Sequence, residues 1–103
     1  MLKLDDKTVF DSVSKGRFLL VFHAKRCPLC PFVLNVLKDL ETTAGKEVTF
    51  AQIDFDANQE AAKFYGIPGI PIVLAIKEGT VINGRPGIAD VETYREFIRE
   101  LSD

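Results

Sequence analysis

Residues 18–32 read Phe-Leu-Leu-Val-Phe-His-Ala-Lys-Arg-Cys-Pro-Leu-Cys-Pro-Phe, and this stretch decides the fold. Its first five residues form a continuous apolar run that is too short for a typical helix and is typical of a strand covered on both faces. Two basic residues, Lys25 and Arg26, come shortly after this run, and they are followed by two cysteines separated by two residues. An amphipathic helical pattern begins directly after them. The order strand, turn, Cys-x-x-Cys, helix therefore predicts that Cys27 and Cys30 lie together at the mouth of a helix.

Similar patterns continue on both sides of this stretch. Apolar residues at spacings of three and four predict helices, and short apolar runs predict strands. The expected helices cover residues 7–14, 32–40, 57–65 and 91–101. The expected strands cover residues 18–22, 48–55, 72–77 and 80–83, with a short extra strand near residues 1–4.

This order predicts how the strands pair. A strand, a helix and a second strand in sequence favour a right-handed crossover and parallel pairing. Glu78 and Gly79 form a turn between two short apolar runs, which indicates an antiparallel hairpin. We therefore expect an α/β fold, with a mixed sheet of four to five strands and helices on both faces, in a single domain of residues 1–103.

Local features sharpen the expected helices. Asp56, followed by Gln59 three residues later, and Asp90 each precede a helical pattern, so we expect both aspartates to act as N-caps. Phe32 belongs to the apolar repeat of the second helix and is expected on its buried face. Pro31 disfavours helical geometry at Cys30, so either the turn should be distorted or the regular helix should begin near Pro31.

Composition narrows the classes of function. The formal net charge is −2, and no run of Lys and Arg occurs, so nucleic acid is not expected as a partner. No apolar run approaches the roughly 18 residues of a membrane span. The N-terminal residues lack the apolar core of a signal peptide. We therefore expect a cytoplasmic protein without membrane association.

The chain has 2 cysteines and 1 histidine. A small secreted scaffold would carry four or more cysteines. A closed zinc site wants four ligands, which these residues cannot complete within one chain. Two thiols in one motif favour redox chemistry, although half of a zinc site would look the same.

The start of a helix favours the reactive form of a cysteine. Unpaired backbone N–H groups and the positive end of the helix dipole there favour a thiolate. We assign Cys27 as the nucleophile that attacks a substrate disulfide and Cys30 as the resolving thiol. Lys25 and Arg26 add positive charge beside Cys27; the alternative is that they are solvated loop residues.

Further along, residues 64–71 read Phe-Tyr-Gly-Ile-Pro-Gly-Ile-Pro, and a strand and Lys77-Glu78-Gly79 follow. Together with the Cys-x-x-Cys turn, this sequence resembles the thioredoxin family over nearly the whole chain. The resemblance implies a thioredoxin-like fold in which Pro71 is a cis-proline packed against the cysteines. It also implies that the backbone of Ile70 pairs with the substrate chain and that Gly87 lies beside the substrate groove.

The sequence departs from the family's pattern near the cysteines. Arg26 stands where the family has tryptophan, so one wall of the usual apolar surface is missing. The family's buried aspartate and its lysine partner align with Val21 and Gln52. His23 stands at an aromatic position; it is either a base that tunes the thiols or a partly buried histidine bonded to backbone.

We therefore expect a thiol–disulfide oxidoreductase that reduces protein disulfides through Cys27 and Cys30. It should need no cofactor and act as a monomer, with a reductase as its electron donor. Two alternatives stay open. One is a binding or scaffold domain of the same fold with weak redox activity, and the other is a metal or cluster site shared between two chains. The sequence does not give the reduction potential of the pair or the direction of net electron flow, but the expected cytoplasmic location favours the reducing end.

Overall fold

The structure, a computed structural model, describes residues 1–102. Its strands form one five-stranded mixed sheet in the order β1-β3-β2-β4-β5. The strands are β1 (Leu2–Leu4), β2 (Arg17–His23), β3 (Thr49–Asp54), β4 (Ile72–Lys77) and β5 (Thr80–Pro86). The helices are α1 (Val9–Val13), α2 (Cys30–Ala44), α3 (Gln59–Phe64) and α4 (Val91–Leu101).

Strand β2 lies at the centre of the sheet. It pairs parallel with β3 and antiparallel with β4. Strand β3 also pairs parallel with β1, and β4 and β5 form the antiparallel hairpin expected from the Glu78–Gly79 turn. The expected mixed sheet, its parallel crossover and the short N-terminal strand are therefore confirmed.

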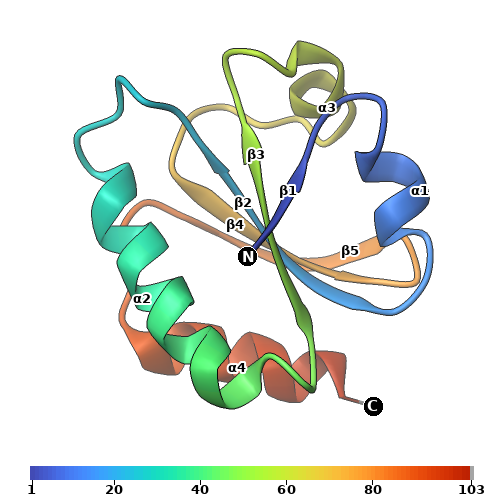
Figure 1. Ribbon diagram of the computed structural model, residues 1–103, viewed down its shortest axis with the longest axis vertical. Coiled ribbons are helices and arrows are strands. Elements are labelled where there is room, and N and C mark those ends of the chain that lie inside the picture. The colour runs from blue at the N-terminus through green and yellow to red at the C-terminus, as the bar shows by residue number, and fades with distance from the viewer. Residues whose placement is uncertain (103) are drawn as a thin grey trace.

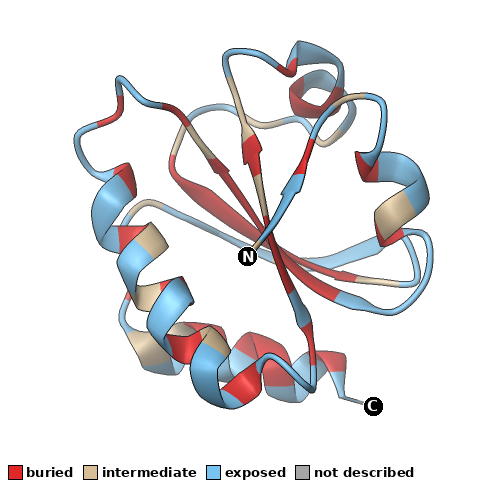
Figure 2. Cartoon of the chain, in the orientation of Figure 1, coloured by how far each residue is buried: buried red, intermediate tan, exposed pale blue. Residues whose placement is uncertain are grey.

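The two faces of the sheet carry different helices. Helices α2 and α4 cover one face, and α1 and α3 cover the other (Figure 1). Along β2, Leu19 and Val21 join the core on the α2 and α4 side, whereas Leu20 and Phe22 join the core on the other side. The central strands are buried on both faces (Figure 2), which explains why β2 is a continuous apolar run.

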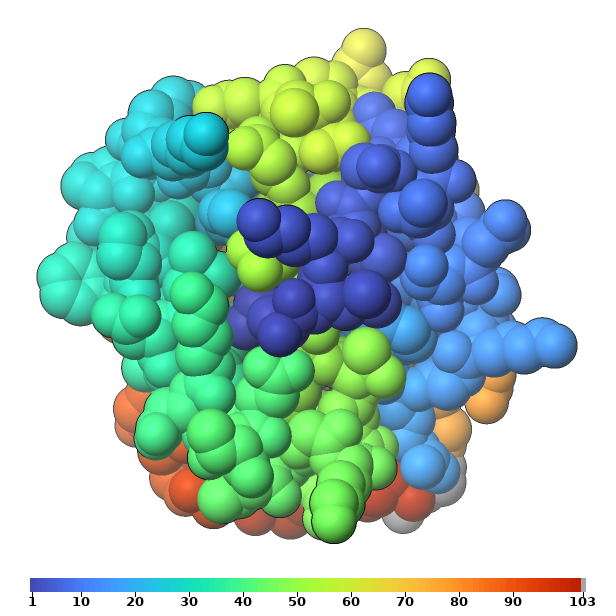
Figure 3. Space-filling view, in the orientation of Figure 1, coloured from blue at the N-terminus to red at the C-terminus, as the bar shows by residue number. Residues whose placement is uncertain are grey.

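The N-terminal segment closes one edge of the sheet. Leu2 pairs with Ala51, and Leu4 pairs with Ile53, so β1 extends the sheet beside β3. Figure 3 shows this segment, in dark blue, lying across the middle of the visible face between the green and teal α2 and the blue region of α1. The N-terminal amino group forms an ion pair with Glu41 of α2 at 3.2 Å, which ties the edge strand to the helix.

Helix α2 begins at Cys30, with Pro31 in its first positions, close to where the sequence predicts the regular helix to start. The prediction for Phe32 is wrong, because its side chain is 60% exposed. Val33, Leu37 and Leu40 turn toward the sheet instead. Phe32 precedes Val33 by one residue, and the turn of about 100° between them carries Phe32 away from the face that Val33, Leu37 and Leu40 share.

The predicted caps have different outcomes. Asp90 caps α4 and accepts a hydrogen bond from the backbone N–H of Thr93, as expected. The prediction that Asp56 caps α3 is wrong, because Asn58 occupies the N-cap position. The carboxylate of Asp6 reaches across from the segment between β1 and α1 and accepts from the backbone N–H of Ala61 at 2.8 Å. A cap supplied from 55 residues away leaves no local pattern in the sequence.

Candidate active site

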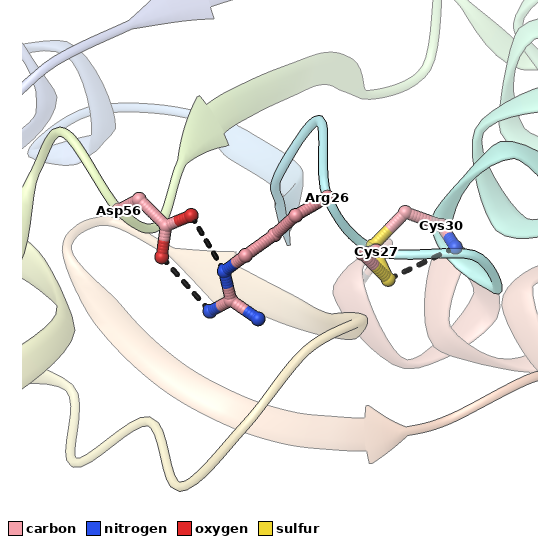
Figure 4. Close-up of a disulfide and its surroundings, with 4 residues drawn as sticks. All are labelled: Arg26, Cys27, Cys30 and Asp56. Carbon is pink, nitrogen blue, oxygen red and sulfur yellow. Dashed lines mark hydrogen bonds and ion pairs between the residues drawn. A yellow bond between two sulfur atoms is a disulfide. The ribbon is translucent and has the colours of Figure 1, made fainter.

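Cys27 and Cys30 lie between the end of β2 and the start of α2. Cys27 belongs to the connecting loop, where its backbone N–H donates to the carbonyl of Ala24 at 3.2 Å. Cys30 is the first residue of α2. The two side chains form a disulfide, with their Cα atoms 5.4 Å apart (Figure 4). The strand, the turn and the helix thus bring the pair together as the sequence predicts.

The opening turn of α2 aims a donor at Cys27. The backbone N–H of Cys30 donates to Sγ of Cys27 at 3.1 Å. The first turn of α2 contains no acidic side chain, so nothing there offsets the positive end of the helix dipole. Cys30 is 1% exposed and Cys27 is 7% exposed. After reduction, the same N–H can stabilise a thiolate on Cys27, which is the more accessible sulfur.

The segment before β4 and the end of β5 meet at this edge of the sheet. The Ile70–Pro71 peptide bond is cis, as the resemblance implies. Pairing of Phe22 with Ile72 places Pro71 just beyond the end of the ladder that leads to the cysteine loop. The backbone N–H of Gly87 donates to the carbonyl of Pro71 at 2.8 Å. Three segments that are far apart in sequence therefore frame one site.

Comparison with known proteins accounts for this arrangement. The sequence profile of the Thioredoxin family matches residues 1–100. This chain belongs to the thioredoxin family. It is 31% identical to the thioredoxin of Bacillus subtilis over 97% of this chain and 96% of that protein. It is 29% identical to the thioredoxin of Listeria monocytogenes, with 95% of each chain covered.

A thioredoxin of Mycobacterium tuberculosis is 31% identical over 90% of this chain and 78% of that protein. The five-stranded mixed sheet and the helices on both its faces are consistent with the thioredoxin fold. Membership of the family and the Cys27–Cys30 pair make this chain a thiol–disulfide oxidoreductase.

Arg26 fills the family's tryptophan position in an unexpected way. Its Nε donates to Oδ2 of Asp56 at 2.8 Å, and its Nη2 donates to Oδ1 at 2.9 Å. This bidentate ion pair joins the cysteine loop to the segment between β3 and α3 (Figure 4). The hydrogen bond from Arg26 lowers the pKa of the Asp56 carboxyl, and the same bond raises the pKa of Arg26. The sequence predicts Asp56 as the N-cap of α3. In the structure it instead binds Arg26 beside the cysteine loop.

His23 and Lys25 line a separate pocket. A cavity of about 200 Å³ is lined by Lys3, Leu4, His23, Lys25, Gln52 and Asp54. Neither cysteine lines it. Burial lowers the pKa of His23, and the negative charge of Asp54 and a hydrogen bond with Gln52 oppose this effect only in part. The structure therefore places His23 among polar side chains of β3, on the α2 side of the sheet.

The family's buried acid and its basic partner are both replaced. Val21 is fully buried and lies beside Gln52 in the ladder between β2 and β3. Valine cannot accept a proton and glutamine carries no charge. Neither side chain can therefore take up the proton of Cys30 as a carboxylate would.

Sequence reasoning missed an apolar surface beside the cysteines. Leu29, Phe32 and Ile88 have large exposed side chains. Leu29 lies inside the motif, Phe32 lies in the first turn of α2, and Ile88 follows Gly87. The sequence signals this surface only through the nearness of these residues to the cysteines and to Gly87. Apolar spacing alone predicts that Phe32 lies in the core. Leu29 and Phe32 thus flank Cys30 in the sequence, and exposed apolar side chains at a reactive disulfide are typical of a surface that meets a partner.

Membrane-spanning helices and metal-binding clusters are both absent from the described residues. Within residues 1–102, none of the helices is both long and apolar enough to cross a membrane. In the same part of the chain, no group of three or more His, Cys, Asp and Glu side chains is placed to hold a metal ion.

Proposed function

We propose that this protein reduces disulfide bonds in other proteins, with Cys27 as the nucleophile and Cys30 as the resolving thiol. The observation that carries the assignment is the hydrogen bond from the Cys30 backbone N–H to Sγ of Cys27. It stabilises negative charge on one sulfur of the pair and not on the other. The lower burial of Cys27 supports the same order of attack.

The reaction transfers two electrons from the dithiol to the substrate. The Cys27 thiolate attacks one sulfur of the substrate disulfide, and a mixed disulfide forms as the other substrate sulfur leaves and takes up a proton. Cys30 then loses its proton and attacks Sγ of Cys27. The second substrate thiol is released, and the Cys27–Cys30 disulfide seen in the structure remains.

The segments around the cysteines suit a substrate chain. We propose that the backbone of Ile70, directly before cis-Pro71, pairs with an extended substrate segment. Gly87 has a φ of 74°, and a Cβ built on it would meet no atom within 4 Å. Its missing side chain leaves open space beside Pro71. Arg26 borders the same surface, and Lys25 adds positive charge near Cys27.

The surrounding system follows from the chemistry. A disulfide that forms in each cycle needs a reductant, so we propose a reductase as the electron donor and a monomer, acting as one domain of residues 1–103, as the working unit. With 2 cysteines, both in the motif, the composition supports a reducing compartment, and we propose the cytoplasm. The exposed apolar side chains by the disulfide are then available to substrate and reductase in turn.

A turnover assay tests this function. The purified protein, supplied with dithiothreitol, should reduce the accessible disulfides of insulin faster than dithiothreitol alone. Cys27→Ser should abolish the acceleration. A wild-type protein that gives no acceleration would remove the reductase assignment and favour the scaffold alternative. Zinc or iron at about half an equivalent per chain would favour the shared metal site instead.

A further inference from the structure

We propose that Arg26 determines substrate specificity by binding a carboxylate beside the substrate's disulfide. The inference rests on the proposed disulfide reduction and adds the chemistry of the preferred substrate. It starts from the ion pair between Arg26 and Asp56, which replaces an aromatic side chain at the lip of the site.

The ion pair with Asp56 uses two of the five N–H donors of the guanidinium and leaves three unused. A guanidinium has five N–H donors, arranged as a side-on fork through Nε and one terminal nitrogen and an end-on fork through both terminal nitrogens. Asp56 occupies the side-on fork, through Nε and Nη2. In Figure 4 the third nitrogen faces away from Asp56, and it forms no hydrogen bond with a protein group within residues 1–102. The Arg26 side chain is 62% exposed, so the end-on fork is open to a ligand.

Asp56 also fixes where this fork lies. Arg26 is the residue directly before Cys27, whereas Asp56 follows β3, and the two carboxylate oxygens hold the guanidinium in one plane. A long side chain normally loses conformational freedom when it binds a ligand. Because the Arg26 side chain is already held, a substrate carboxylate meets a prepared donor pair on the residue that precedes the reacting cysteine.

The unused N–H donors of Arg26 favour an acid over a base. Asp54 accepts from the backbone N–H of Ala57 at 3.0 Å, and Asp56 is occupied by Arg26. Lys25 forms no ion pair within residues 1–102. Lys25 and Arg26 carry two positive charges, and Asp54, whose charge also acts on Arg26, and Asp56 carry two negative ones, so the free N–H donors of Arg26 and not a net charge select a carboxylate. A lysine on the substrate would meet donors and positive charge, while a carboxylate would meet a bidentate partner.

Three disulfide-bridged peptides test the proposal. They are identical except for Glu, Gln or Lys next to the cysteine, and each is mixed with the reduced protein while the rate constant of disulfide exchange is measured. We expect the Glu peptide to react about five-fold faster than the Gln peptide, the effect of one exposed ion pair. The ratio should fall toward one in 0.5 M NaCl, because salt screens exposed charges.

Variants separate a charge contact from a general effect on the thiol. Arg26→Gln should bring the ratio of the Glu and Gln rates to about one. A change in the reactivity of Cys27 would alter all three rates together and leave the ratio intact. Arg99→Gln is the matched control, because Arg99 pairs with Glu96 through the same two nitrogens on α4, which lies away from the cysteine loop (Figure 1). It should keep the five-fold ratio.

Equal rates for the three peptides in the wild type would overturn the proposal while leaving disulfide reduction in place. A five-fold ratio that persists in Arg26→Gln would overturn it as well. A wild type that reacts with none of the peptides would overturn the proposed function, and this inference with it.

Discussion

Gly87 donates its backbone N–H to the carbonyl oxygen of Pro71 at 2.8 Å, and this bond joins the end of β5 to the residue before β4. Gly87 has a φ of 74°, in the left-handed region that glycine adopts without steric cost. A side chain at this position would point into open space. The glycine therefore serves both a backbone conformation and an unobstructed surface beside cis-Pro71.

Replacing Gly87 should affect both stability and activity. Gly87→Ala should lower the free energy of unfolding by about 1–2 kcal/mol, because alanine is disfavoured at positive φ. It should also lower kcat/KM for a protein disulfide about ten-fold, which corresponds to about 1.4 kcal/mol lost in the transition state. Urea unfolding and insulin reduction measure the two effects.

Gly16 provides the matched control for this substitution. It has a φ of 87°, and a Cβ built on it would also meet nothing within 4 Å. It lies before β2, at the opposite end of that strand from the cysteines. Gly16→Ala should cost similar stability and leave kcat/KM unchanged. An equal loss of activity in both variants would show that Gly87 acts only through stability.

The Tyr94 hydroxyl gives a prediction for stability alone. Tyr94 is fully buried in the core beneath α4, and its hydroxyl has no hydrogen-bond partner among the described residues. A buried hydroxyl without a partner costs about 1–3 kcal/mol. Tyr94→Phe should therefore raise the free energy of unfolding by about 1 kcal/mol in a urea titration. A loss of stability on this substitution would mean that the hydroxyl is hydrogen-bonded in solution.

The lowered pKa of His23 predicts how the free energy of unfolding depends on pH. Burial is the largest cause that lowers its folded-state pKa below 6.5, while Asp54 and Gln52 oppose it and Lys3 and Lys38 add to it. The imidazole of the unfolded chain therefore binds a proton more readily than that of the folded protein. The free energy of unfolding keeps its full value above the unfolded-state pKa of His23 and falls as the pH decreases from that pKa toward the folded-state pKa. His23 is the only histidine of the chain.

Urea midpoints between pH 7.5 and 5.5 measure this effect. The wild type should lose stability toward pH 5.5, whereas His23→Gln should lose less over the same range. A wild-type midpoint that rises toward pH 5.5 would mean that the folded protein holds the proton more tightly than the unfolded chain. That result would reverse the sign of the assigned shift.

The reduction potential should lie at the reducing end of the family. Asp56 takes up the charge of Arg26, so less positive charge is left to stabilise the Cys27 thiolate and, with it, the reduced form. We expect a value near −270 mV in an equilibrium titration against dithiothreitol buffers, as for thioredoxin-like reductants. A value near −120 mV would place the pair with oxidants and contradict the direction of electron flow proposed above.

Much of the fold could be predicted because its signals are local. The apolar run of β2, the Glu78–Gly79 turn and the Asp90 cap each act within a few residues, and all three are confirmed. The cysteine pair belongs to the same class, since strand, turn and helix are adjacent in the sequence. Most X–Pro bonds are trans, so the cis peptide bond at Pro71 is predicted by the resemblance to the family and not by a local rule.

The errors arose where tertiary contacts override local preference. Asp56 precedes a helix and so is predicted as its cap, but its carboxylate binds a guanidinium 30 residues earlier in the chain, and Asn58 occupies the N-cap position. Asp6 caps α3 in its place from a distant segment. Phe32 satisfies the helical repeat and still faces solvent, because a short window of apolar spacing fits two adjacent faces.

A trapping experiment tests the central claim, that Cys27 attacks first, most directly. Cys30→Ser, incubated with a protein that has one accessible disulfide, should accumulate a mixed disulfide through Cys27, since the resolving thiol is missing. Mass spectrometry of the non-reduced complex identifies the linked residue. Cys27→Ser should form no such complex under the same conditions. Trapping through Cys30 in Cys27→Ser, at a rate equal to that of the first variant, would contradict the assignment.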